Sequence, residues 1–381
     1  MRWTRKRGYL TLIAAVAVLV VVGIVAFQFL RRGQPYRPPQ VGFEGRSTDL
    51  RQTVVVPTLD TPMPAGKNVV WCGSLQIAWN RLRDDLLRSP PSIAGAEAVV
   101  SRLNQAGLTE QDLPEDSFLA AAGWVKDGIA ERVQGQMEER FQVEVSFDDM
   151  PVDTEALVYS YLQAHVKFAI PFFENEKLFL FKDSQDHETS VASFGIRPED
   201  DYAYDRLRGQ VEVLYAQGRD NGWTPQPDQF IVDLCRDSTP NQIVLACVDP
   251  RETLAETLKD VDEKIRDFLA RWRDVTSRDT LLVPNMNWQM EHRFAELEGP
   301  DKPFLNQGFE GYYCSCVLQT IRFKLDRSGA ELASEFKAYA EPWRTDYVFN
   351  RPFLVYIKKR DADGPFFVMW VDNAELLSKP Q

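Results

Sequence analysis

The sequence lacks the residue patterns on which most enzymes depend. Only three histidines occur in 381 residues, His165, His187 and His292, and none has a partner at the spacing of a metal-binding helix. There is no Gly-x-Ser-x-Gly elbow, no phosphate-binding loop and no dinucleotide fingerprint. These absences predict a protein that is not an enzyme and that has no metal site and no cofactor.

Cysteine is also scarce. Cys72, Cys235, Cys247, Cys314 and Cys316 are too few and too scattered for a disulfide scaffold. Cys314 and Cys316 lie two apart in a strand-like stretch, so we expect them to face the same way, but no further zinc ligands accompany them. We therefore expect buried thiols. Whether Cys235 and Cys247 are bridged stays open.

Long hydrophobic runs are absent except for one near the N-terminus. Residues 9–30 carry no charge over 22 positions, enough to cross roughly 30 Å of hydrocarbon as a helix. The run exceeds an ordinary signal-peptide core and lacks a small-x-small cleavage site, which favours an uncleaved anchor over a cleaved signal peptide. Four basic residues precede it, so the positive-inside rule predicts a cytoplasmic segment at 1–8, a transmembrane anchor at 9–30 and a periplasmic or extracellular remainder.

Positive charge is sparse in that remainder. Residues 1–32 hold six basic and no acidic side chains, which leaves 38 basic and 56 acidic side chains, a net charge of −18, for the rest of the chain. Phosphate contacts require clustered Lys and Arg. The composition therefore predicts no nucleic-acid partner and a solvated domain attached to the membrane through residues 9–30.

Residues 31–66 are rich in proline and poor in periodic apolar residues, which predicts an extended linker before a folded domain at 67–381. Within that domain the apolar spacing predicts helices first and mostly antiparallel strands later, the order of an α+β fold. The expected elements are a helix at 74–89 capped by Ser74, a helical zone at 116–140, a strand within 155–173, a hairpin turning at Thr239 and Pro240, a helix starting at Asp249 and Pro250, and C-terminal strands within 281–288, 312–325, 351–359 and 364–371.

One long stretch between two strands shows no periodic pattern. Residues 327–346 separate the alternating sequence "TIRFKLD" from the β-branched and aromatic sequence "RPFLVYI". Connections of this length are uncommon in compact domains and are usually functional or disordered. Both readings, a functional loop and a disordered surface excursion, are open at this point.

The C-terminal sequence carries a family resemblance. "VLQTIRFKLDRSGAE", a long loop and "VFNRPFLVYIKKRDADGPFFVMWVDN" resemble the C-terminus of serpins, in which an exposed reactive-centre loop lies between two strands. Phe349, Pro352 and Phe353 match the motif after the loop. Upstream, "NVVWCGSLQIAWNRL" is similar to the first serpin helix region and retains Asn68 and Ser74. The resemblance touches most of residues 68–381 and is strongest from about residue 310 onward.

The resemblance implies a serpin-like α+β fold and a loop that serves as bait for a protease. A cut loop of this kind enters the central sheet as an additional strand. The implied hinge is Gly329, Ala330, Glu331, Leu332, Ala333 and Ser334, and the implied scissile region is Glu341, Pro342, Trp343 and Arg344. Ala330, Leu332, Ser334 and Phe336 would face inward after insertion, because strand side chains alternate.

This sequence departs from the family pattern at several positions. Arg327 replaces an acidic residue, Ala330 replaces a threonine, and Leu332 and Glu335 interrupt the small-residue hinge. Little chain separates the first helix from residue 116, which predicts an abridged central sheet. Two functions are therefore expected: an anchored inhibitor of a serine or cysteine protease, and, as the alternative, a non-inhibitory binding or structural module at the membrane surface. The target protease and the oligomeric state stay open.

Overall fold

The computed structural model describes residues 41–147, 155–165, 168–198, 205–217, 227–268, 274–276, 278–328 and 345–380. The expected anchor at 9–30 and the expected hinge and scissile residues lie outside these ranges. Within them, no helix is both long enough and apolar enough to cross a membrane.

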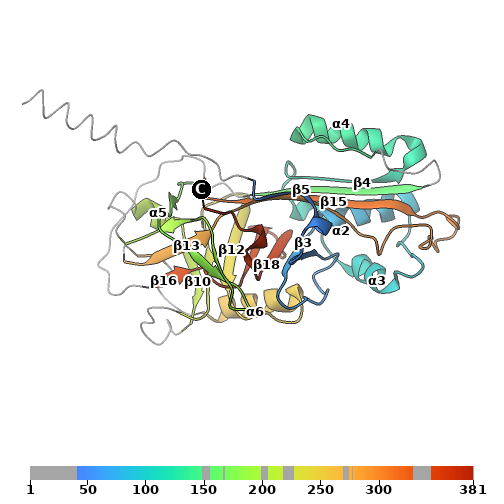
Figure 1. Cartoon of the computed structure of the whole chain (residues 1–381). Helices are drawn as coiled ribbons and strands as arrows, with labels where there is room; N and C mark the ends of the chain where they lie inside the picture. The colour runs from blue at the N-terminus through green and yellow to red at the C-terminus, as the bar shows by residue number, and fades with distance from the viewer. Residues whose placement is uncertain are drawn as a thin grey trace, which may run out of the picture. The chain divides into compact units, whose positions relative to one another are not determined.

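A five-stranded sheet, here called the central sheet, forms one layer of the fold (Figure 1). Its two middle strands are parallel to each other over ten residue pairs, whereas the strands beside them, β14 and β4, pair with them in antiparallel fashion. In spatial order the strands are β1 (Phe43–Arg46), β14 (Met286–Arg293), β15 (Cys314–Leu325), β5 (Ala156–His165) and β4 (Phe118–Trp124).

A seven-stranded sheet forms the second layer. Its strands are buried on both faces, which explains their nearly continuous Val, Ile, Leu and Phe content. One face contributes to the main core, which is the hydrophobic cluster that includes residues of both sheets, and the other face packs against α6. The order is β10 (Glu212–Ala216), β11 (Phe230–Asp233), β12 (Asn241–Cys247), β17 (Phe353–Lys359), β18 (Phe367–Val371), β3 (Asn68–Cys72) and β2 (Thr53–Val55).

A smaller four-stranded sheet lies at the end of the central sheet where the long loop starts and ends (Figure 1). It consists of β16 (Asp346–Val348), β13 (Thr280–Pro284), β9 (Ser193–Ile196) and β6 (Phe173–Glu174), and β7 (Leu180–Lys182) and β8 (Glu188–Ser190) form a separate hairpin. At Gly195 a Cβ atom would lie 1.8 Å from the Leu281 carbonyl oxygen, so the close approach of β9 to β13 requires glycine.

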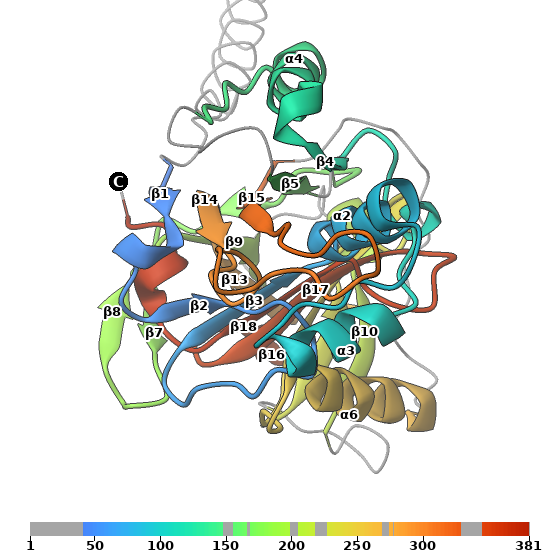
Figure 2. The same ribbon diagram turned by 90° about the vertical axis from the view of Figure 1, so that its right-hand side faces the viewer.

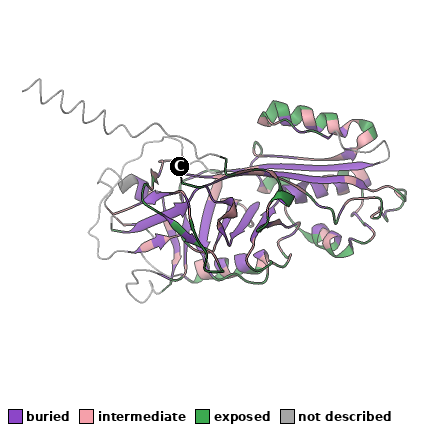
Figure 3. Ribbon diagram, viewed as in Figure 1, coloured by how far each residue is buried: buried purple, intermediate pink, exposed green. Residues whose placement is uncertain are grey.

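Helices cover both faces of the central sheet (Figures 1 and 2). α2 packs on the inner face of β4 and β5, whereas α4 lies on their outer face. The outward faces of α4 and α6 are exposed, while the sheets between the helices are buried (Figure 3). The helices are α2 (Ser74–Arg81), continued by a π-helical turn at Leu82–Leu87, α3 (Glu97–Gln105), α4 (Ile129–Phe141), α5 (Asp205–Gly209) and α6 (Leu254–Asp267).

Residues 42–55, here called the N-terminal strap, connect the edges of both sheets. β1 pairs in parallel with β14, and the Gly42 amide donates to the Asn287 carbonyl at 2.6 Å. Seven residues after the end of β1, β2 begins and pairs in parallel with β3 at the edge of the seven-stranded sheet. The folded domain therefore includes residues that the sequence analysis assigned to the linker at 31–66.

Side-chain hydrogen bonds hold the strap at two points. The Glu375 carboxylate accepts from the backbone amides of Arg51 and Gln52, at 2.8 and 2.9 Å, and from the Thr53 hydroxyl at 2.8 Å. The Ser47 hydroxyl lies 2.7 Å from Nδ1 of His292, on β14. Hydrogen bonds to a charged acceptor are stronger than neutral ones, so Glu375 is the firmer of the two attachments.

The partly buried His292 ring makes stability depend on pH. Burial lowers the pKa of His292 to about 4, whereas the pKa of an unfolded histidine is about 6.5. Because only the unfolded chain binds this proton between those values, the contribution is fully present above pH 6.5 and is lost as the pH falls to 4, about 3 kcal/mol in total. Urea unfolding at pH 7 and pH 4.5 should show a smaller loss of stability in His292→Gln than in the natural chain. Equal losses would contradict this assignment.

The zone at 116–140, expected to be helical, contains a strand as well as a helix. β4 occupies Phe118–Trp124, and α4 begins only at Ile129. The sequence "FLAAAG" has high helix propensity, but pairing with β5 and packing on both sides of the sheet override that preference. The expectation of a continuous helical zone was therefore wrong in its first half.

One predicted helix start and one predicted N-cap were also wrong. α6 begins at Leu254 with Thr253 as its N-cap, whose hydroxyl accepts from the Glu256 amide, and not at Asp249 and Pro250. Ser74 lies inside α2 and makes no cap bond, because its hydroxyl is engaged by the central sheet. The expected hairpin and the strands within 312–325, 351–359 and 364–371 are confirmed. The strand expected within 281–288 was wrong, because this stretch is divided between β13 and β14, which belong to different sheets.

All five cysteines are buried free thiols, as expected, so Cys235 and Cys247 are not bridged. The expectation that Cys314 and Cys316 share a face was wrong. The pairing of β15 with β5 shifts register between them, and this irregularity turns Cys314 into the main core and Cys316 toward α4.

Candidate functional site

The two ends of the long loop are fixed on the described structure. At the start, the Phe172 amide donates to the Arg327 carbonyl at 3.0 Å, and both the amide and the hydroxyl of Ser328 donate to Asp326. At the end, the Thr345 amide donates to the Asp279 carboxylate at 2.6 Å. The chain between these points leaves the end of β15 and returns into β16, which pairs with β13.

The residues after the loop are positioned by aromatic packing. Phe349 and Phe353 are fully buried, with ring centroids 5.2 Å apart, and Phe349 also packs 4.9 Å from Phe230. The Phe349 amide donates to the Leu282 carbonyl at 2.9 Å. Pro352 is half-buried immediately before β17. These three residues, expected from the motif, therefore fix the return of the loop to the core.

The boundary between β5 and β15, here called the seam, begins beside the start of the loop. Within the described central sheet it is the one boundary between two long parallel strands. The other parallel pair, β1 with β14, includes a strand of only four residues. A parallel pair is slightly less stable per residue than an antiparallel pair. Two parallel neighbours can also both accept one antiparallel strand between them. The seam is therefore the weakest pairing per residue between long strands of the described central sheet.

The face of the seam that points to the main core is apolar except for one pair of facing residues, here called the polar rung: Gln319 of β15 and Ser160 of β5. Val317, Ile321 and Phe323 of β15 face the main core, but Gln319 stands between them with no exposed surface. Its Nε2 donates to the Cys72 carbonyl at 3.1 Å and to the Ser74 hydroxyl at 3.0 Å. The amide thus ties the seam to the start of α2.

Two buried oxygen atoms at this rung have no hydrogen-bond partner. They are Oε1 of Gln319 and Oγ of Ser160, the residue of β5 in register with Gln319. An unsatisfied buried polar group costs about 1–3 kcal/mol. The pairing of β5 with β15 therefore carries an energetic cost at its centre, because two buried oxygen atoms there lack hydrogen bonds. Sequence reasoning missed Gln319, although a lone amide in an otherwise apolar inward alternation was a usable signal.

The outer face of the seam is covered by α4 and the segment that follows it. Val133 and Met137 of α4 are fully buried against the sheet. Phe147 meets Tyr159 edge-on with centroids 5.7 Å apart, and Phe141 lies 4.6 Å from Tyr161. Burial raises the pKa of both tyrosines above the usual value. These contacts between α4 and the sheet are mostly apolar. A change in the spacing of β5 and β15 would therefore have to move α4 or the segment that follows it.

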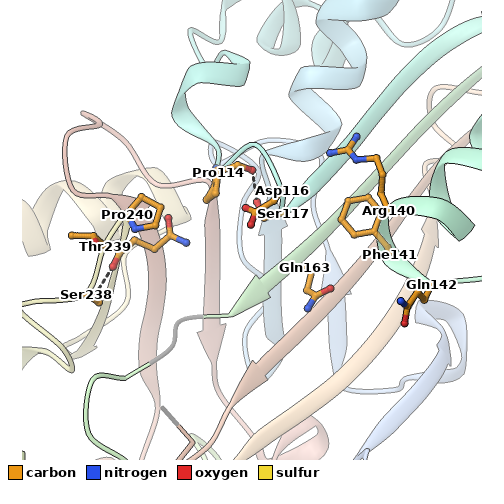
Figure 4. A pocket seen from close by; sticks show the side chains of 11 residues that line it. Pro114, Asp116, Ser117, Arg140, Phe141, Gln142, Gln163, Ser238, Thr239 and Pro240 are labelled. Atoms are coloured by element: carbon orange, nitrogen blue, oxygen red, sulfur yellow. Dashed lines mark hydrogen bonds between the residues drawn. The ribbon is translucent and has the colours of Figure 1, made fainter. Parts of the chain in front are cut away.

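A polar hollow of about 500 Å³ lies near the loop-side end of β4 and β5 (Figure 4). It separates Ser117 and Gln163 from the turn between β11 and β12, with Arg140 at the end of α4 on one side. Gln163 is in register with Arg322 of β15, so the hollow flanks the strands that border the seam. Its lining is Pro114, Asp116, Ser117, Arg140, Phe141, Gln142, Gln163, Ser238, Thr239, Pro240 and Asn241.

In the part of the chain that the structure describes, no three His, Cys, Asp or Glu side chains gather in a metal-binding arrangement. The cysteine thiols are poor metal ligands or nucleophiles in their present positions. Burial raises the pKa of Cys72 and of Cys316 to about 12, which keeps both thiols protonated at neutral pH.

Comparisons with known proteins give likeness in structure but not in sequence. No family model matches the sequence, and no curated protein matches it. Mouse protein-Z dependent protease inhibitor superposes with a TM-score of 0.51 and 12% identity, over 80% of this chain and 91% of the other. Native protease nexin-1, solved with heparin, gives a TM-score of 0.50 and 10% identity, over 81% and 92%. Serpin48 of the insect Tenebrio molitor gives 0.47 and 12% identity, over 80% and 92%.

Proposed function

The chain has the serpin fold, and from this premise we propose that residues 329–344 are the bait loop of a protease inhibitor. In this proposal a serine or cysteine protease cuts the loop, and the freed segment enters the seam between β5 and β15 as an antiparallel strand. The single observation that carries the proposal is the ten-pair parallel seam that starts where the loop departs. In this proposal the chain itself catalyses no reaction.

The driving force follows from strand pairing. Insertion would replace one parallel pair by two antiparallel pairs, and it would turn an unpaired segment into a paired central strand. The closed seam is then a metastable state whose conversion releases free energy. The same conversion could displace a covalently attached protease and distort it.

The register of insertion can be derived from the described end of β15. Asp326 and Arg327 follow β15 directly, so a two-residue hairpin turn at these positions would place Ser328 opposite Leu325. Continuing by strand alternation, Ala330 would then meet Phe323, Leu332 would meet Ile321 and Ser334 would meet Gln319. Each of these loop residues would face the core.

In this register Ser334 could form hydrogen bonds with Gln319 and Ser160. The Ser334 hydroxyl would arrive between Gln319 and Ser160, the two residues whose oxygens lack hydrogen bonds in the closed seam. One hydroxyl can donate to one of these oxygens and accept from the other. The hydrophobic residues of the hinge would meet hydrophobic residues of β15, and its one inward hydroxyl would meet the one inward amide.

We further propose that residues 9–30 anchor the domain in a membrane, with the inhibitor on the periplasmic or extracellular side. The apolar run and the preceding basic residues support this arrangement. An anchored inhibitor would act on proteases that reach the same membrane surface. The hinge departures at Leu332 and Glu335 favour a second candidate, a serpin-like module that binds a partner without trapping proteases.

The test is to incubate the full chain in detergent with a chymotrypsin-like and a trypsin-like protease and to run a denaturing gel. We expect a band at the summed mass that survives boiling in SDS, and sequencing of the released peptide should place the cut within residues 341–344. Cleavage there without a stable complex, and with the protease still active, would refute trapping and support the non-inhibitory module.

A further inference from the structure

Without the N-terminal strap, β14 would be the edge of the central sheet. Strand alternation places the backbone groups of Asn287, Gln289 and Glu291 on the side of β1, and the Gly42 amide indeed meets the Asn287 carbonyl there. An exposed row of such groups along an eight-residue strand is a template for pairing with another chain. β14 is also eight residues long, so a bare β14 edge would offer an extended row of unpaired backbone groups to another strand.

β1 has the features of a protective edge strand. It is only four residues long, and its outward side chains, Glu44 and Arg46, are charged and exposed. Short length and charge are the two common means by which proteins prevent a sheet edge from recruiting further strands. Phe43 packs against the main core and anchors the strand from the other face.

The attachments of the strap lie on parts of the fold that are not next to β1 in sequence. Glu375 follows β18, His292 is the last residue but one of β14, and β3 belongs to the other sheet. The strap is therefore held by three separate elements, and pairing of β1 does not depend on its four residues alone. Such a segment stays docked although its own strand is short.

We propose that the N-terminal strap is an edge guard: by occupying β14 it keeps the central sheet from pairing with a strand of a second copy of this chain. Release of the strap would expose the β14 edge and permit edge-to-edge association between copies. Anchoring of several copies in one membrane, as proposed above, would raise their local concentration and make such protection more important.

The test compares two substitutions at one residue. By alternation from Gly42, the Glu44 amide faces β14, so Glu44→Pro removes a ladder hydrogen bond, whereas Glu44→Ala removes the same side chain and keeps the amide. The full chain, in detergent, is measured by light scattering over a concentration series, and by hydrogen exchange of peptides that cover residues 286–293.

We expect Glu44→Pro to exchange at least about tenfold faster at β14 and to form dimers or larger species as the concentration rises, whereas Glu44→Ala should match the natural chain in both measurements. Ser47→Ala, which removes only the contact with His292, should show the same changes to a smaller degree. Unchanged exchange in Glu44→Pro, or faster exchange in a chain that stays as monomeric as the natural one, would overturn the proposal. Circular dichroism confirms that each variant is folded, and no protease is needed, so the outcome is independent of whether the loop traps one.

Discussion

A chain that carries Ala330→Arg should be cut within residues 341–344 as fast as the natural chain but should fail to insert its loop. In the derived register, residue 330 meets Phe323 on the core side of the seam, where a guanidinium would be buried without a partner. Such a charge costs several kcal/mol, and each 1.4 kcal/mol corresponds to about tenfold in an equilibrium or a rate. We therefore expect the trapped fraction of a protease to fall at least about tenfold.

Glu331→Arg is the matched control, because residue 331 alternates outward, beside the exposed Arg322. Repulsion between two exposed charges is weak, so this variant should behave nearly as the natural chain. A second measurement, the melting temperature, needs no specific protease. In the natural protein and in Glu331→Arg, the cleaved chain should melt at a higher temperature than the intact chain. In Ala330→Arg, cleavage should not raise the melting temperature. Trapping and a thermal rise that are unaffected by Ala330→Arg would refute the register.

Asn68→Ala should lower the free energy of unfolding by about 3–4 kcal/mol. Asn68 has no exposed surface, and its Oδ1 accepts from the amides of Asp372 and Asn373 at 2.8 and 3.0 Å. Its Nδ2 donates to Oδ1 of Asn373 at 2.9 Å and to the Thr53 hydroxyl at 3.2 Å. Truncation would leave several of these buried groups without partners, each at a cost of about 1–3 kcal/mol, partly relieved by relaxation.

Asn241→Ala serves as the control for that measurement. It is the same substitution at a half-buried position, and Oδ1 of Asn241 makes no hydrogen bond that could be lost. Because the substitution also removes a buried oxygen without a partner, it should leave the free energy of unfolding unchanged or raise it slightly. Denaturant unfolding of the two variants at pH 7 compares them directly, and similar losses in both would show that the Asn68 network adds little to stability.

Strands with strong local patterns could be predicted from the sequence. β11, β12, β17 and β18 are rich in β-branched and aromatic residues and are bounded by turns, so their local preference agrees with their final environment. β4 could not be predicted in this way, because "AAAG" becomes a strand only through its pairing with β5. The serpin-like α+β fold followed from the resemblance at the C-terminus, and the structural likenesses confirm it.

The candidate site was predictable in part. The loop, and the motif at Phe349, Pro352 and Phe353, were visible because they are contiguous in sequence. The seam was not, since its strands are about 150 residues apart and the parallel direction of their pairing is a tertiary property. The strap was missed for a similar reason: its strands of four and three residues carry too little pattern, and the contacts that hold it come from Glu375 and His292.

The position of β18 has a consequence for synthesis of the chain. β18 lies between β3 and β17, so β3 cannot gain this neighbour until Phe367–Val371 has been made. Some 300 residues separate Asn68 from Phe367. At about 5–20 residues per second, β3 waits roughly 15–60 s with its apolar "NVVWC" sequence lacking this partner. Nascent chains of this protein should therefore depend on holding factors until β18 has been made, and a truncation that removes β18 should be far more damaging than the loss of five residues suggests.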